Sequence, residues 1–150
     1  TATAMVAEAE ERSMALWAVF GRHFLGCSLI GRGAAEAGLA EIHRARGDAE
    51  KLKNKIFLPM TLSFEAEALA SLGRFEEALC QTELAMRAIE ETGELWWQAE
   101  VYRIEGEILI ASGRPHAENR MRRALEIADQ QKAKLLQERA RAGIADAALH

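Results

Sequence analysis

Residues 73–79 read GRFEEAL, and the stretch 40 positions earlier, residues 33–39, reads GAAEAGL. The same shift superposes an aromatic residue, a small residue, a leucine and a glycine in three successive copies. The copies are Trp17, Gly26, Leu29 and Gly33, then Phe57, Ala66, Leu69 and Gly73, then Trp97, Gly106, Leu109 and Gly113. Recurrence at a period of about 20 to 50 residues is typical of repeat proteins. The sequence therefore predicts three copies of one structural unit.

The composition predicts that each unit is helical. Only two of the 150 residues are proline, residues with high helix propensity are abundant, and no strand pattern is present. We expect a first helix at about 16–31, 56–72 and 95–112, ended by the recurring glycine in a left-handed C-terminal cap. A second helix is expected at about 34–51, 75–92 and 115–131. Each unit is then an antiparallel helix hairpin.

Small residues recur where the two helices of a hairpin should meet. Gly26, Ala66 and Gly106 precede the turn glycine by seven residues, so the first helix can approach the second closely. Each second helix carries two matching small residues that are seven positions apart. The pairs are Gly38 and Ala45, Ala78 and Ala85, and Ala117 and Ala124; the shift from the second pair to the third is 39 residues instead of 40. We expect these positions to be buried and intolerant of larger side chains.

A single hairpin of this kind cannot bury its apolar face, so the units should stack and their ends should be covered. Residues 1–14 are expected to be the end of a preceding second helix, and 133–149 a helix that caps the last repeat. The repeats occupy about 16–54, 56–93 and 95–131 of a single domain, residues 1–150. The predicted fold is all-α, a right-handed superhelix of about eight helices. Because the first residue is Thr1, we expect a fragment of a longer protein.

The order of small residue, leucine, glycine, aromatic residue and two alanines resembles the tetratricopeptide (TPR) repeat. It is clearest in Ala66, Leu69, Gly73, Phe75, Ala78 and Ala85. More narrowly, residues 73–79, 91–100, 103–107 and 122–128 resemble the C-terminal repeat regions of bacterial signalling proteins. Those proteins join an adenylate or guanylate cyclase domain, or a winged-helix DNA-binding domain, to a regulatory ATPase module. The chain departs from the TPR pattern in its period of 40, in Thr82 and Arg22, and in lacking a proline after each second helix.

The resemblance implies that the face lined by first helices is concave and binds proteins or peptides. The positions carried over to this face are Phe20, His23 and Cys27, then Met60, Ser63 and Glu67, then Glu100, Arg103 and Glu107. This mixture of charged and apolar residues suits a helix or extended segment with a basic stretch and a few apolar anchors. The alternative is that several of these residues are ordinary solvated surface.

Other classes of function receive little support from the sequence. A net charge of −4 gives no electrostatic reason to expect nucleic acid, and the composition does not indicate a membrane span. Cys27 and Cys80 suit reduced thiols in a cytoplasmic protein. The histidines lack zinc-ligand spacing, and the neighbours His23 and Cys27 have no acid to orient them as base and nucleophile. We expect no enzyme, no catalytic residue, no metal and no cofactor.

Three functions from different classes stay open. The first is a protein-protein interaction or regulatory module of a bacterial signalling protein, which binds a partner or another domain of the parent chain. The second is a homo-oligomerisation module built on the exposed ends of the stack. The third is a small-ligand sensor, which a deep apolar pocket with convergent polar groups would favour. Trp96 is either a partner anchor or, with Trp97, a wedge between hairpins. The basic run 43–55 is expected to be a solvated helix end.

Overall fold

The computed structural model describes residues 1–11 and 14–149. These residues form eight α-helices and one short 3-10 helix, without any strand, which confirms the all-α prediction. The helices are α1 (Ala2–Glu11), α2 (Ala15–Gly31), α3 (Ala35–Lys51), α4 (Leu58–Ser71), α5 (Phe75–Thr92), η1 (Leu95–Trp97), α6 (Gln98–Ala111), α7 (Ala117–Gln130) and α8 (Lys134–Ala147). The segment 12–13 of the expected leading helix lies outside the described residues.

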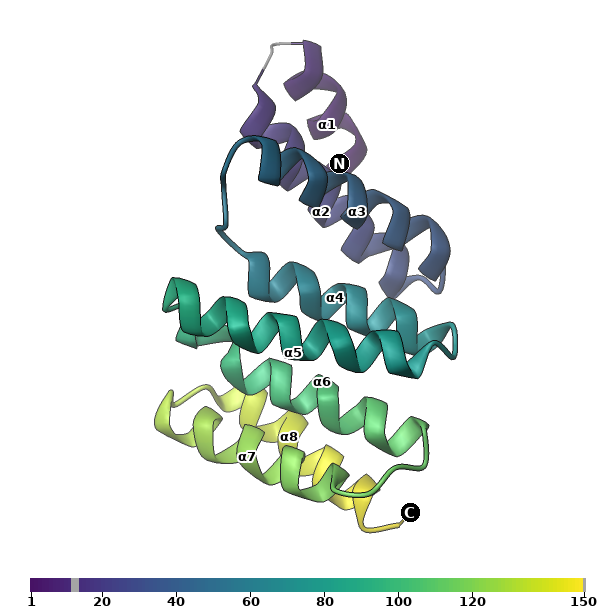
Figure 1. The fold of residues 1–150 in the computed structure, drawn as a ribbon, viewed down its shortest axis with the longest axis vertical. Coiled ribbons are helices and arrows are strands. Elements are labelled where there is room, and N and C mark those ends of the chain that lie inside the picture. The colour runs from purple at the N-terminus through teal and green to yellow at the C-terminus, as the bar shows by residue number, and fades with distance from the viewer. Residues whose placement is uncertain (12–13, 150) are drawn as a thin grey trace.

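Three hairpins, α2–α3, α4–α5 and α6–α7, follow one another along the long axis of the molecule (Figure 1). Helix α1 packs on α2 at one end, and α8 packs on both α6 and α7 at the other. The first helices also touch one another, α2 with α4, α4 with α6, and α6 with α8. Helix α8 therefore lies where the first helix of a fourth hairpin would lie. The right-handed superhelical winding stays a prediction.

The recurring glycines end the first helices as expected. Gly33, Gly73 and Gly113 have positive φ angles of 81°, 74° and 65°. In each turn the amide of the next residue donates to the carbonyl of the recurring leucine, at 2.9 Å; the bonds are Ala34 to Leu29, Arg74 to Leu69 and Arg114 to Leu109. This closes the last helical turn and brings the second helix back along the first.

Three helix starts differ from the expected bounds, each for a local reason. Helix α4 begins at Leu58 because Phe57 has a left-handed backbone with φ 62°. Helix α7 begins at Ala117 because His116 also has a positive φ, 75°, and follows Pro115. In the third hairpin, the first helix was expected to begin at about residue 95, but residues Leu95–Trp97 form the 3-10 helix η1 and α6 begins at Gln98.

The helices meet at the small residues. A β-carbon on Gly26 of α2 would lie 2.9 Å from the carbonyl oxygen of Gly38, so these two backbones are nearly in contact. The same place in the second hairpin is filled by Ala66 and Ala78, both 0% exposed. A core cluster continues across neighbouring hairpins and consists of Leu39, Ala66, Ala68, Leu69, Ala78, Ile104 and Ile108. The expected close packing at these positions is confirmed.

The contact between α2 and α3 leads to a stability prediction. The new methyl group of Gly38→Ala would lie 2.7 Å from the carbonyl oxygen of Gly26 and 2.6 Å from a side-chain carbon of Ile30. Because the carbonyl belongs to a helix backbone, the helices must separate, and the free energy of unfolding should fall by about 1 to 3 kcal/mol. Urea denaturation followed by circular dichroism measures this.

Gly47→Ala is the matched control on the same helix. No atom lies within 4 Å of the added carbon, so only the gain in helix propensity remains, a stabilisation of up to about 1 kcal/mol. Equal effects of the two substitutions would contradict the close approach of α2 and α3.

Candidate functional site

The nine residues predicted for the first-helix face lie on α2, α4 and α6, three on each helix, but they differ widely in exposure. Glu107 is exposed. The half-buried members are Phe20, Cys27, Met60 and Glu67, and the buried members are His23, Ser63, Glu100 and Arg103. Several of these residues are therefore packed between helices. Their role in binding stays a prediction.

Four of the nine residues form a charge cluster around Arg103. The Arg103 guanidinium donates to both carboxylate oxygens of Glu100, at 2.7 and 2.9 Å, and to Glu67 of α4 at 3.1 Å. It is also paired with Glu107. Glu100 is also paired with Arg139 of α8. This first-helix charge cluster, comprising Glu67, Glu100, Arg103, Glu107 and Arg139, links α4, α6 and α8.

Burial sets the electrostatics of the cluster. The side chains of Arg103 and Glu100 are 3% and 4% exposed. Burial acts to lower the pKa of Arg103, but the hydrogen bond and charge of Glu100 outweigh it and hold that pKa above its ordinary value. Burial raises the pKa of Glu67, against the opposing charge of Arg103. The guanidinium therefore stays charged and depends on its carboxylates for solvation.

His23 and Cys27 do come together, one helical turn apart on α2. The Cys27 sulfur lies 3.6 Å from Nε2 of His23, and Nδ1 of His23 lies 3.1 Å from the hydroxyl of Thr61 on α4. Burial lowers the pKa of His23 to about 4, and burial, with the charge of Glu67, raises the pKa of Cys27 to about 12. At neutral pH the pair is an uncharged imidazole beside a protonated thiol. A cysteine nucleophile requires the thiolate, so this arrangement lacks the activated form.

Aromatic rings line the starts of the first helices. Phe57 contacts Phe20 of α2 and Trp96 of η1, with ring centres 5.7 and 6.1 Å apart. Trp97 packs against Phe64 of α4, with its Nε1 donating to the Ser63 hydroxyl at 3.1 Å. Both tryptophans thus contact the preceding hairpin, although Trp96 is still 47% exposed. This agrees with the wedge interpretation and leaves part of Trp96 accessible.

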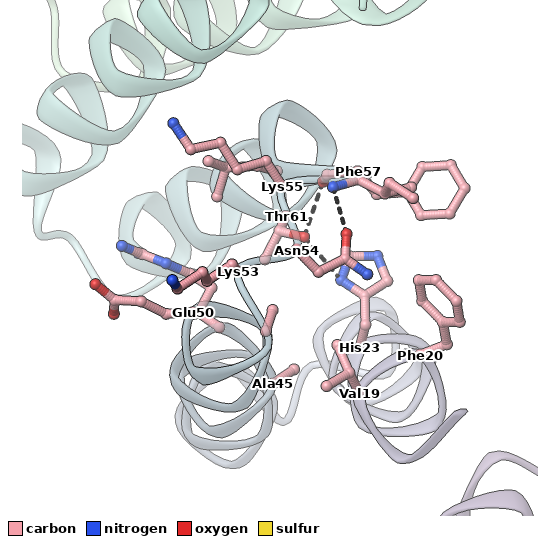
Figure 2. Close-up of a pocket in the computed structure, with 14 residues that line it drawn as sticks. Val19, Phe20, His23, Ala45, Glu50, Lys53, Asn54, Lys55, Phe57 and Thr61 are labelled. Carbon is pink, nitrogen blue, oxygen red and sulfur yellow. Dashed lines mark hydrogen bonds between the residues drawn. The ribbon is translucent and has the colours of Figure 1, made fainter. Parts of the chain in front are cut away.

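A pocket of about 400 Å³ lies between the first two hairpins, beside this row of rings (Figure 2). It is bounded by α2, the end of α3, the connection 52–57 and the start of α4. Its lining residues are Val19, Phe20, His23, Ala45, Arg46, Ala49, Glu50, Lys53, Asn54, Lys55, Ile56, Phe57, Leu58 and Thr61. Of these, only Phe20 and His23 were among the residues singled out for the site.

A second buried ion pair joins α3 to α4 near the pocket. Glu65 has a fully buried side chain, paired with Arg46 and with His43 Nε2 at 3.4 Å. Burial raises the pKa of Glu65, and the charges of Arg46 and His43 oppose this effect. The basic run 43–55, expected to be solvated, therefore contains an arginine that pairs with a buried carboxylate.

Sequence reasoning overlooked Arg139, Glu65 and most of the pocket. The sequence does contain a signal for Arg139. After the turn glycine the shift between the second and third copies is 39 residues, as from Ala78 to Ala117, and the same shift carries Glu100 to Arg139. Glu65 gives no comparable signal, since a single glutamate in a helix is usually exposed. The pocket depends on the sizes of side chains on three elements, which the spacing of motifs does not report.

Among the described residues, no helix combines the length and the apolar character needed to cross a membrane. Within residues 1–11 and 14–149, no group of three or more metal-ligating side chains is placed to hold an ion. The sequence matches no model of a known protein family and no curated protein.

Proposed function

We propose that this domain is a protein-interaction module whose first-helix face receives a helix or extended segment of a partner. The partner is another protein or a neighbouring domain of a longer chain. The observation that carries the proposal is the succession of α2, α4, α6 and α8, each in contact with the next. Stacked hairpins of this kind present an extended surface to which several repeats contribute, as in other helical repeat proteins.

The chemistry of the accessible side chains favours a basic partner segment with apolar anchors. The side chain of Glu107 is 51% exposed and that of Glu67 is 28% exposed. The charge cluster holds three carboxylates and two guanidinium groups, so it keeps one negative charge in excess. Half-buried Met60 and partly exposed Trp96 offer apolar contacts on the same helices or at their starts. A lysine or arginine flanked by apolar residues would complement this surface.

The resemblance to the TPR regions of bacterial cyclases and ATPase-type transcriptional regulators supports a cytoplasmic signalling role. In that role, partner binding would control a cyclase, ATPase or transcriptional output. Such control requires that the partner bind one state of the parent protein more tightly than the other.

Site-specific photo-crosslinking in cells tests the proposed face. A benzophenone amino acid replaces Glu107 on α6 in one protein and Glu83 on α5 in another, since Glu83 is an exposed glutamate, 70% accessible, on a second helix. We expect one protein segment to be captured from position 107 and not from position 83. The corresponding synthetic peptide should bind the purified domain about fivefold more weakly after Glu107→Lys, and equally well after Glu83→Lys.

Equal capture from both positions, or capture from position 83 alone, would place the partner elsewhere. Binding of the peptide that is unchanged by Glu107→Lys would contradict the charge complementarity. Circular dichroism of each variant is the control that tests whether its fold is retained.

Homo-oligomerisation is the second candidate, and exposed rings at the N-terminal end favour it. Trp17 and Phe24 of α2 are 52% and 51% exposed. Trp97, which corresponds to Trp17 two copies later, packs against Phe64, and Phe64, which corresponds to Phe24 one copy later, also packs against His23 of the preceding first helix. The exposed pair thus presents an apolar surface of the kind that stacking buries elsewhere. A molecular mass that rises with protein concentration would favour this candidate.

A further inference from the structure

The pocket exists because two equivalent interfaces are filled differently. The shift of 40 residues matches Ala49 to Ile89 and Thr61 to Val101. Ile89 and Val101 are 1% and 0% exposed and belong to the core cluster between the second and third hairpins. At the interface between the first and second hairpins, the smaller Ala49 and the more polar Thr61 line the pocket instead.

The aromatic residues at the two interfaces also behave differently. Trp97 packs into the core cluster of the second interface, where its ring contacts Phe64. Its counterpart Phe57 has a left-handed backbone, and its ring lies beside Phe20 on the side of the pocket away from Ala45 (Figure 2). This conformation is strained for a bulky non-glycine residue. The interface between the first and second hairpins therefore lacks an aromatic ring at the place that Trp97 fills between the second and third hairpins.

The pocket is lined partly by apolar and partly by charged side chains. Val19 and Ala45 are buried apolar residues of the lining, and Leu58 is a half-buried one. The two buried polar side chains of the lining, His23 and Thr61, are hydrogen-bonded to each other. Their hydrogen-bonding capacity is largely used, so the interior offers mainly apolar contact.

Charged groups lie across the pocket from the aromatic rings. Arg46, Lys53 and Lys55 supply three positive charges to the lining, against the single carboxylate of Glu50. Arg46 is paired with Glu65, and Lys55 with Glu91 at 2.9 Å. For Lys53, no carboxylate of the described residues lies within ion-pair distance. Figure 2 shows Lys53 and Glu50 on the side opposite Phe20 and Phe57.

We propose that this pocket binds a small amphipathic acid. An apolar body would lie among Val19, Ala45 and Leu58, and an anionic head group would pair with Lys53 at the charged side. A volume of about 400 Å³ is within the usual range for small-molecule sites. The pocket shares Phe20 and His23 with the predicted first-helix face, but its lining does not include Glu107, the residue that tests partner binding, so each proposal can fail without the other.

Calorimetric titration with octanoate, octanol and octylamine tests both the site and the class of ligand. We expect octanoate to bind the wild-type domain saturably, with one molecule per chain, and more tightly than the alcohol or the amine. Ala49→Ile introduces the residue that fills the second interface and should weaken octanoate binding at least about tenfold. Ala40→Ile, at an exposed position of the same helix, adds the same side chain outside the pocket and should leave binding unchanged.

Lys53→Gly tests the head group without disturbing the backbone. Lys53 has φ 52°, which glycine adopts without strain, and its counterpart in the second repeat is Gly93. This change should weaken octanoate binding about two- to fivefold, as loss of an exposed ion pair would, and leave octanol binding unaltered. In nuclear magnetic resonance spectra, the methyl groups of Val19 and Leu58 should shift on binding, while those of Ile89 and Val101 should not.

Absence of saturable octanoate binding would overturn the proposal, as would binding that Ala49→Ile leaves intact. Octanol or octylamine binding as tightly as octanoate would refute an acid as the ligand. Ala49→Ile should be at least as thermally stable as the wild type, because it fills a cavity. If this variant does not fold, Lys53→Gly supplies the second test of the same site, and octanoate binding that Lys53→Gly leaves unchanged would contradict the proposal.

Discussion

Replacing Arg103 with methionine should lower the free energy of unfolding by roughly 3 to 5 kcal/mol. The guanidinium is 3% exposed and is the main partner of Glu100, whose side chain is 4% exposed. Methionine fills a similar volume but leaves a buried carboxylate without the two hydrogen bonds it receives at 2.7 and 2.9 Å. Glu100 then keeps its pair with Arg139, which is 42% exposed, and loses its buried partner, and the loss of a buried partner costs far more than an exposed ion pair contributes. Urea denaturation at pH 7, followed by circular dichroism, measures the change.

Two further variants show whether burial is the cause. Glu107→Gln removes an exposed partner of the same arginine and should cost less than about 1 kcal/mol. Combining Arg103→Met with Glu100→Leu removes both buried charges and should recover most of the stability, because Arg139, 42% exposed, can be solvated by water. A cost for Arg103→Met no larger than that for Glu107→Gln would show that Glu100 does not depend on Arg103.

The charge cluster also limits which residues can report on partner binding. Arg103 joins α4 to α6, so its loss would change the shape of the face as well as its charge. An effect of Arg103 variants on partner binding would be ambiguous for that reason. Glu107 is exposed and can be reversed in charge with little expected effect on packing, which makes it the better probe.

The hairpins were predictable from the sequence because their signals are local. A glycine that adopts a positive φ at 33, 73 and 113 ends a helix regardless of what surrounds it. The small residues Gly26 and Gly38 are equally direct, since only small side chains permit such a close approach. The unexpected starts of α4 and α7 arise where Phe57 and His116 adopt a conformation that their side chains disfavour.

The depth of the candidate site was not predictable in this way. Helical spacing places Glu100 and Arg103 on the first-helix face, but their burial depends on Glu67, 36 residues before Arg103, and on α8. The pocket depends on the difference between Ala49 and Ile89, which becomes meaningful only when both interfaces can be compared in space. A period identifies equivalent positions and does not tell how completely each is filled.

Acidification from pH 7 to pH 4 should destabilise the wild-type domain by about 3 kcal/mol more than a His23→Gln variant. Burial lowers the pKa of His23 in the folded state from 6.5 to about 4, so the unfolded chain binds the proton more tightly between these values. The contribution of His23 is therefore present above pH 6.5 and is lost as the pH falls towards 4. Glutamine keeps a neutral polar group beside Thr61 and does not titrate. Urea denaturation at half-unit pH intervals measures the difference between the two proteins.

The comparison with the variant isolates His23 from groups of opposite sign. Burial raises the pKa of Glu65 and of Glu67, so protonation of these carboxylates favours the folded state as the pH falls. Both proteins share these effects, and Cys27, whose pKa is raised to about 12, stays protonated throughout. Parallel pH profiles for wild type and His23→Gln would mean that the imidazole is solvated in the folded state. A difference confined to the interval between pH 6.5 and 4 would instead locate the acid-sensitive contact at His23 and Thr61, where α2 meets α4 beside the pocket.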